Sequence, residues 1–135
     1  MIKYTWGLAA IALIIWPHAV FAKECWALSN LKGQAAFSDE GYKFQNDGYS
    51  KPMVLCFAGE AGSVSGDDTT LMKFGDSTLA GAATNNGVVL FEVYQIDRTH
   101  KKVLFTKSRI VPPNIISVFS PMVGAFVGDV IKLSD

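Results

Sequence analysis

The sequence predicts a mainly β protein with a minor helical part. We expect a small antiparallel meander, sandwich or partly closed barrel, with one C-terminal helix packed on it and one disulfide. Short β-prone runs separated by Gly, Asn, Asp, Ser and Pro fill residues 41–110. Apolar residues at helical spacing follow over 121–133, and the chain has two cysteines. These elements are expected to form one domain over residues 23–135.

The first 22 residues have the layout of a secretory signal peptide. Lys3 precedes an uninterrupted apolar run from Gly7 to Trp16, and small residues end the segment at Ala22. The run covers only about ten residues, whereas a membrane-spanning helix needs roughly 20. We therefore expect cleavage near Ala22 and a mature periplasmic or secreted chain, soluble and about 110 residues long, which suits one domain.

The mature chain keeps both cysteines, Cys25 and Cys56. An even cysteine count in an exported protein favours a disulfide, and two cysteines allow one intramolecular pairing. Closing a loop of this length should stabilise the fold by about 3 to 4 kcal/mol and hold the N-terminus against the sheet.

Residues 65–81 contain a doubled phrase, with Gly66-Asp67 and Gly75-Asp76 each leading into a hydroxyl-rich, apolar segment. Such residues are typical of turns, because Asp and Thr side chains bond to backbone groups two residues on. We interpret the phrase as two turns around a short strand at 71–74. If both turns shared one edge of the sheet, Asp67, Asp68 and Asp76 would form an acidic rim for a basic partner or, as a weaker alternative, for calcium. Strand alternation argues against a shared edge.

The clearest hairpin covers residues 87–110. It follows Asn86-Gly87, a strong signal for a tight turn. If its own turn centres on residues 99 and 100, cross-strand pairing follows directly. The expected pairs are Glu92 with Lys107, Tyr94 with Phe105, and Ile96 with Val103. Phe91 and Val93 make the opposite face apolar as well, so we expect more sheet or a helix to cover it.

The helix near 121–133 is expected to provide that cover. Ser120-Pro121 offers an N-cap and a first-turn proline. The uncharged stretch 110–128 is long enough to span a membrane, but prolines interrupt it. Gly124 and Gly128 would allow close approach to the sheet. An exposed partner-binding face that includes Phe119 and Phe126 is the alternative.

Charge and histidine content exclude several function classes. Acidic and basic residues balance at 12 each, so the basic excess typical of nucleic-acid binding is absent. Arg98, His100, Lys101 and Lys102 are interpreted as a solvated hairpin loop, with anion contact as the alternative. His100 is the only histidine after residue 22, which argues against histidine catalysis and zinc. We expect no catalytic residue, metal ligand or cofactor.

Carboxylates are the remaining candidates for chemistry. No spacing singles out a pair among them. Glu92 lies inside an apolar strand, where burial could raise its pKa, although a simple ion pair with Lys107 is the preferred interpretation. The six acids considered are Glu60, Asp67, Asp68, Asp76, Glu92 and Asp97.

The sequence therefore predicts an exported, non-catalytic binding protein. Its expected partner is another exported protein, such as an envelope-acting enzyme that it binds or inhibits. One alternative is a small-ligand carrier whose curved sheet closes over an apolar pocket lined by Phe74, Phe91, Tyr94 and Phe105. Another is a carboxylate-based enzyme acting on glycans. The weak candidates for partner contact are Asp67, Asp68, Asp76, Arg98, His100, Lys101, Phe119 and Phe126.

Overall fold

The computed structural model describes residues 23–116 and 118–134, so the expected signal peptide lies outside the described residues. Within them the chain forms nine strands and one short 3-10 helix. The elements are β1 (Lys23–Phe37), η1 (Ser38–Glu40), β2 (Gln45–Tyr49), β3 (Met53–Ala58), β4 (Ala61–Val64), β5 (Asp67–Phe74), β6 (Thr78–Asn85), β7 (Val88–Asp97), β8 (Lys102–Ile110) and β9 (Met122–Ser134).

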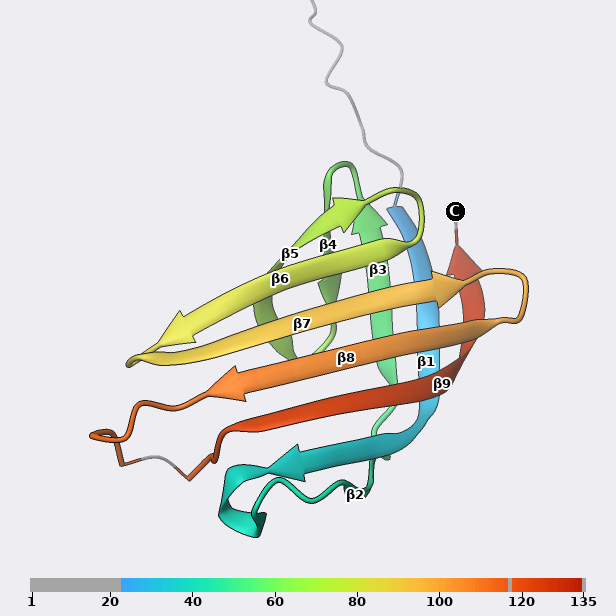
Figure 1. The fold of residues 1–135 in the computed structure, drawn as a ribbon. Coiled ribbons are helices and arrows are strands. Elements are labelled where there is room, and N and C mark those ends of the chain that lie inside the picture. The colour runs from blue at the N-terminus through green and yellow to red at the C-terminus, as the bar shows by residue number, and fades with distance from the viewer. Residues whose placement is uncertain (1–22, 117, 135) are drawn as a thin grey trace, which may run out of the picture.

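The strands form a closed antiparallel barrel (Figure 1). From β3 to β9 each strand pairs with the next one in the chain, as expected of a meander, and β1 pairs with both β3 and β9. The pairing of β1 with β9 closes a ring of eight strands. β2 is an extra strand that pairs with the second half of β1.

The long strand β1 makes this arrangement possible. It pairs with β9 along its length, while its other edge pairs first with β3 and then with β2. The register with β9 shifts between Ser29 and Lys32, and Asn30 between them has a φ of 55°. Such a bulge bends a strand. The bend turns the second half of β1, and with it the paired strand β2, so that Tyr49 of β2 contacts the buried rings of Phe105 and Phe126.

The predicted C-terminal helix is wrong, because residues 122–134 form strand β9. The apolar residues of this segment match a period of two as well as a helical period. The glycines decide between the two: a Cβ on Gly128 would lie 2.7 Å from the carbonyl oxygen of Ser29. The strand needs this close approach, and the β-branched residues of the segment, Val123, Val127, Val130 and Ile131, favour a strand. The buried positions are Met122, Gly124, Phe126, Gly128 and Val130.

The local turn predictions are confirmed. Asn86 and Gly87 both have positive φ, 50° and 80°, and connect β6 to β7 as a two-residue hairpin turn. In the doubled phrase, a turn precedes and another follows one strand, but that strand is β5 (Asp67–Phe74), so residues 67–70, expected in the first turn, belong to the strand instead. The Asp67 carboxylate still accepts a hydrogen bond from the amide of Thr69, two residues on. The three predicted cross-strand pairs of the β7–β8 hairpin are also those observed.

The disulfide is confirmed as well. Cys25 and Cys56 lie directly opposite each other on β1 and β3, with their Cα atoms 4.1 Å apart. No helix in the described part of the chain is long and apolar enough to cross a membrane. Aromatic and aliphatic side chains fill the barrel interior; its buried members include Trp26, Leu28, Leu31, Leu55, Phe57, Leu71, Leu79, Tyr94, Val103, Phe105 and Phe126.

Candidate functional site

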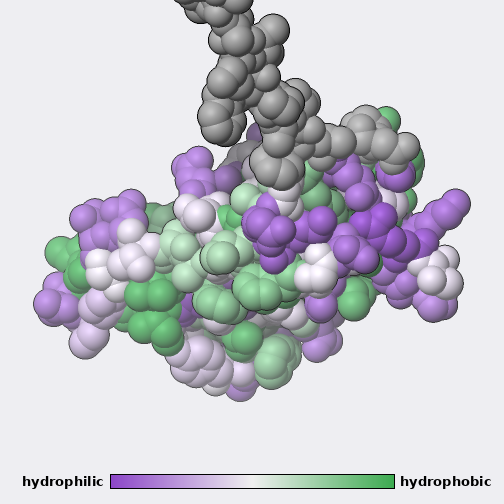
Figure 2. Space-filling model, turned by 90° about the horizontal axis from the view of Figure 1, so that it is seen from above, coloured by the Kyte–Doolittle hydropathy of each residue, from purple (hydrophilic) through white to green (hydrophobic). Residues whose placement is uncertain are grey.

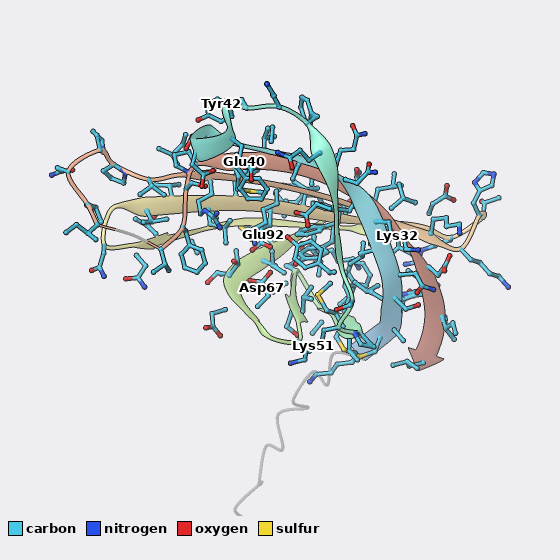
Figure 3. The ribbon with its side chains drawn as sticks, turned by 90° about the horizontal axis from the view of Figure 1, so that it is seen from below. Lys32, Glu40, Tyr42, Lys51, Asp67 and Glu92 are labelled. Carbon is cyan, nitrogen blue, oxygen red and sulfur yellow. A yellow bond between two sulfur atoms is a disulfide. The ribbon has the colours of Figure 1, made fainter. Side chains whose placement is uncertain are left out.

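A cavity of about 590 Å³ opens into the barrel interior. Three parts of the chain surround it: the end of β2 with the following loop, the turn between β4 and β5, and the inner faces of β7 and β8. Viewed from below, Asp67 and Glu92 lie beside each other within the ring of strands (Figure 3). The lining residues used below are Tyr49, Lys51, Met53, Asp67, Asp68, Leu90, Glu92, Tyr94, Phe105 and Lys107.

Strand alternation places the polar groups of this cavity. On β7, Glu92 and Tyr94 are two residues apart and both point inward, and Glu92 is only 3% exposed. Asp67 and Thr69 point inward from the start of β5 in the same way. The barrel brings these two strands together although about 25 residues separate them in the chain.

The four side chains form one hydrogen-bonded cluster, which we call the carboxyl cluster: Asp67, Thr69, Glu92 and Tyr94. The Thr69 hydroxyl donates to Glu92 Oε1 at 2.7 Å. The Tyr94 hydroxyl lies 2.8 Å from Asp67 Oδ2 and 3.2 Å from Glu92 Oε2. Every buried side-chain nitrogen and oxygen among the described residues has a hydrogen-bond partner. The cluster is therefore an ordered part of the cavity floor.

The geometry assigns the protons of the carboxyl cluster. The Tyr94 hydroxyl has one hydrogen, and its shorter contact directs that hydrogen to Asp67. Glu92 then faces a lone pair of the Tyr94 hydroxyl oxygen and the carboxylate of Asp67, and a proton on Glu92 relieves the repulsion between these oxygens. Of the two acids, Asp67 is therefore the one that ionises more readily, and Glu92 is the one that holds its proton more tightly.

The pKa shifts agree with this assignment. Burial raises the pKa of Glu92, and the adjacent Asp67 raises it further, against a hydrogen bond from Thr69 that lowers it. Burial alone would also raise the pKa of Asp67. However, hydrogen bonds from Thr69, Glu92 and Tyr94 favour its charged form and lower its pKa overall. Burial and the two acids raise the pKa of Tyr94, so it stays a neutral donor.

Aromatic rings form one wall of the cavity. Tyr94 and Phe105 stack with centroids 4.4 Å apart, and Phe126 continues the row on β9. Tyr49 on β2 meets Phe105 edge to face at 5.7 Å. Burial raises the pKa of Tyr49 to about 12, so its phenol is neutral. The cavity thus combines an apolar wall with a polar floor.

The preferred interpretation of Glu92, an ion pair with Lys107, is corrected. The two residues are opposite in register as predicted, but the described residues show no ion pair within 4 Å between them. Glu92 bonds instead to Thr69 and Tyr94, because its side chain is buried beside β5. Lys107 lines the cavity and lies 6.0 Å from the ring centroid of Tyr49.

Asp67, Asp68 and Asp76 do not form an acidic rim. This agrees with the strand alternation, which places consecutive turns at opposite ends of the sheet. Asp67 and Asp68 lie at the cavity, at the start of β5, whereas Asp76 lies in the turn beyond its other end. In the described part of the chain no three His, Cys, Asp or Glu side chains are grouped as metal ligands.

The basic candidates belong to the exposed turn between β7 and β8. Arg98 is tied down there: it forms an ion pair with Glu24 at 2.6 Å and donates to Ser77 and to the Asp76 carbonyl. His100 Nδ1 lies 2.8 Å from Asp97. Lys101, with a φ of 54°, shapes the turn. These contacts give Arg98 a structural role at the end of the barrel opposite β2.

The two aromatic candidates for partner contact, Phe119 and Phe126, differ in their exposure. Phe126 is 2% exposed and belongs to the core, so it cannot contribute to an exposed face. Phe119 is exposed in the β8–β9 loop, 4.8 Å from the guanidinium of Arg109. Of the residues expected to line an apolar pocket, Tyr94 and Phe105 do so, while Phe74 and Phe91 point outward.

Sequence reasoning missed Tyr49 and Thr69. Tyr49 sits in a short polar strand, QNDGY, and reaches the cavity only because β1 bends; no local signal marks it. Thr69 could have been found from alternation, since Asp67 and Thr69 are two residues apart before the apolar Leu71. Comparisons with protein-family models, curated proteins and solved structures find no match for this chain. Its function is therefore argued from the geometry.

Proposed function

We propose that this protein binds a small amphipathic molecule in the cavity without chemical change. The observation that carries the proposal is the cavity itself: about 590 Å³, with an aromatic wall and a few converging polar groups at its floor. Ligand sites in proteins have this size and composition. The expectation of an exported protein as partner stays a prediction.

The floor selects the polar group of the ligand. Asp67 is the charged acceptor of the carboxyl cluster and is only half-buried, so a ligand can reach it. A protonated amine or amidine would donate to it and gain a charge-assisted hydrogen bond. The apolar part of the ligand would lie against Phe105, Tyr49 and Met53. We therefore propose an amine with an aromatic or aliphatic body as the ligand class.

The same geometry favours binding over glycan hydrolysis. Enzymes that use two carboxyl groups hold them at least about 5 Å apart, with the sugar between them. Here the Asp67 and Glu92 carboxyls both lie within hydrogen-bond distance of the single Tyr94 hydroxyl, at 2.8 and 3.2 Å. The Tyr94 hydroxyl thus occupies the position between the two carboxyls that a sugar would need.

The test uses 2-phenylethylamine as the probe and 2-phenylethanol as its uncharged match, each followed by amide chemical shifts. The amine is expected to shift resonances of the cavity lining with at least about tenfold higher affinity than the alcohol. Asp67→Asn should abolish that preference. Asp76→Asn, at the other end of β5, is the matched control and should keep it.

Thermal unfolding of both variants checks that each is folded. Equal affinities for amine and alcohol would contradict the proposed ligand class. Shifts confined to residues outside the cavity, with the probe at about 10 mM, would contradict the site itself.

A further inference from the structure

The outer face of the barrel over β6 to β9, which we call the uncharged face, is covered by no strand or helix within the described residues. Phe44, in the loop before β2, lines a hollow on this face together with Phe91, Thr106, Ser108, Val123 and Ala125. Outward positions alternate with the inward ones of the cavity and core. Register aligns them in rows across the four strands: Ala80, Val93, Thr106 and Ala125 in one row, Ala82, Phe91, Ser108 and Val123 in the next, with Val89, Leu104, Ile110 and Val127 beside them.

No charged side chain interrupts these rows. Phe91 is 51% exposed and Val123 is 43% exposed, and Ile110 is more exposed than either. Seen from above, green side chains gather along the lower side of the view, which carries β6 and β7 (Figure 2). The sequence predicts a cover for this hairpin face, and the expected cover, a C-terminal helix, is instead a strand of the same sheet. A contiguous apolar face of this kind marks an interaction surface.

We propose that a second copy of this chain covers the uncharged face, so that the protein is a homodimer. An isologous interface pairs a surface with itself, and a surface without charge does this without like-charge repulsion. Two copies of one twisted sheet can also pack face to face at about 10 Å. This inference rests on the outer face and is independent of the cavity.

The size of the uncharged face fits a dimer. Four strands at about 4.8 Å and seven residues at about 3.4 Å give a footprint near 450 Å² in projection. Protruding side chains raise the accessible area. Ile116 and Val118, in the loop between β8 and β9, are almost fully exposed apolar residues. The total approaches the roughly 600 Å² per partner of the smallest standard interfaces.

A membrane surface fits less well. Peripheral membrane proteins combine apolar contact with basic residues and interfacial Trp or Tyr. The outward positions of β6 to β9 that form the face contain none of these residue types. A second copy is therefore the better occupant.

Sedimentation velocity tests the dimer, with the protein purified in the form that its host produces. We expect twice the mass of one chain at about 100 µM. Phe91→Lys with Val123→Lys places four like charges at the two-fold interface and should weaken association at least about 100-fold. Val54→Lys is the matched control: Val54 is 38% exposed on β3, opposite β7 in the ring, and this variant should remain dimeric.

A second readout needs no substitution. Methyl resonances of Val123 and Val127 should be protected from a soluble paramagnetic probe at high protein concentration and exposed on dilution. A wild-type protein that is monomeric at every concentration would overturn the proposal, as would a dimer that survives the double substitution. Monomers that sediment with lipid vesicles would overturn it too and assign the face to lipid.

Discussion

Glu92 is a carboxylic acid with only 3% of its surface exposed to water. It is buried between β5 and β7, beside a charged Asp67, and accepts a hydrogen bond from Thr69. A carboxyl group in such a place holds its proton more tightly in the folded protein than in the unfolded chain. Glu92 therefore makes the stability of the protein depend on pH.

The sign of that dependence is fixed. Because the folded pKa of Glu92 lies above its ordinary value of 4.5, its stabilising contribution is complete below pH 4.5 and is lost as pH rises through the folded pKa. Glu92→Gln keeps the shape and the neutral state. We expect the free energy of unfolding of wild type to fall relative to this variant as pH rises above 4.5.

Urea unfolding at several pH values measures the difference. Asp67 contributes with the opposite sign at lower pH: its depressed pKa gives stability that is lost as pH falls through the folded pKa. Glu60→Gln, which removes an exposed carboxyl in the β3–β4 turn, is the control for general charge effects. Parallel curves for wild type and Glu92→Gln would show that Glu92 is ionised in the fold.

Strand β9 is the element that completes the barrel. It pairs with β8 on one edge and with β1 on the other, so its inward side must be narrow where the bent β1 crosses it. Gly128 and Gly124 have no side chain on this side, which leaves room for Leu31 and Ala35 to pack against them. The fold therefore depends on alternation along β9 and not on a helical stripe.

Gly128→Ala tests the strand. Its Cβ would overlap the Ser29 carbonyl, a backbone atom that cannot move aside, and we expect a loss of about 1 to 3 kcal/mol in the free energy of unfolding. Ile131→Thr keeps a β-branched residue at an outward position of β9 that is 67% exposed and lies outside the uncharged face, and it should change stability by less than about 0.5 kcal/mol. Equal costs at the two positions would contradict the alternation.

At the scale of the whole molecule, local features could be predicted and closure could not. The register of the β7–β8 hairpin follows from one turn and its flanking residues, and the cysteines predict their own pairing. The pairing of β1 with β9 joins the first and last strands of the barrel, and no local sequence pattern predicts such a long-range pairing. The apolar residues of β9 satisfy both periods, so a helix was expected where the barrel closes.

The candidate site shows the same limit. Asp67 and Glu92 could each be named as candidates, and the burial of Glu92 follows from its apolar strand. Their convergence depends on the curvature that brings β5 over β7. The entry of Tyr49 depends on the bend in β1 at Asn30. Both are properties of the closed barrel, which supplies a cavity that the separate strands do not contain.

The most direct test of the cavity as a ligand site is a crystal structure of the protein with 2-phenylethylamine. The account predicts the ammonium nitrogen at about 2.7 to 3.2 Å from the Asp67 carboxylate, with the phenyl ring against Phe105 and Tyr49. A probe bound elsewhere on the chain, with only solvent in the cavity, would contradict it.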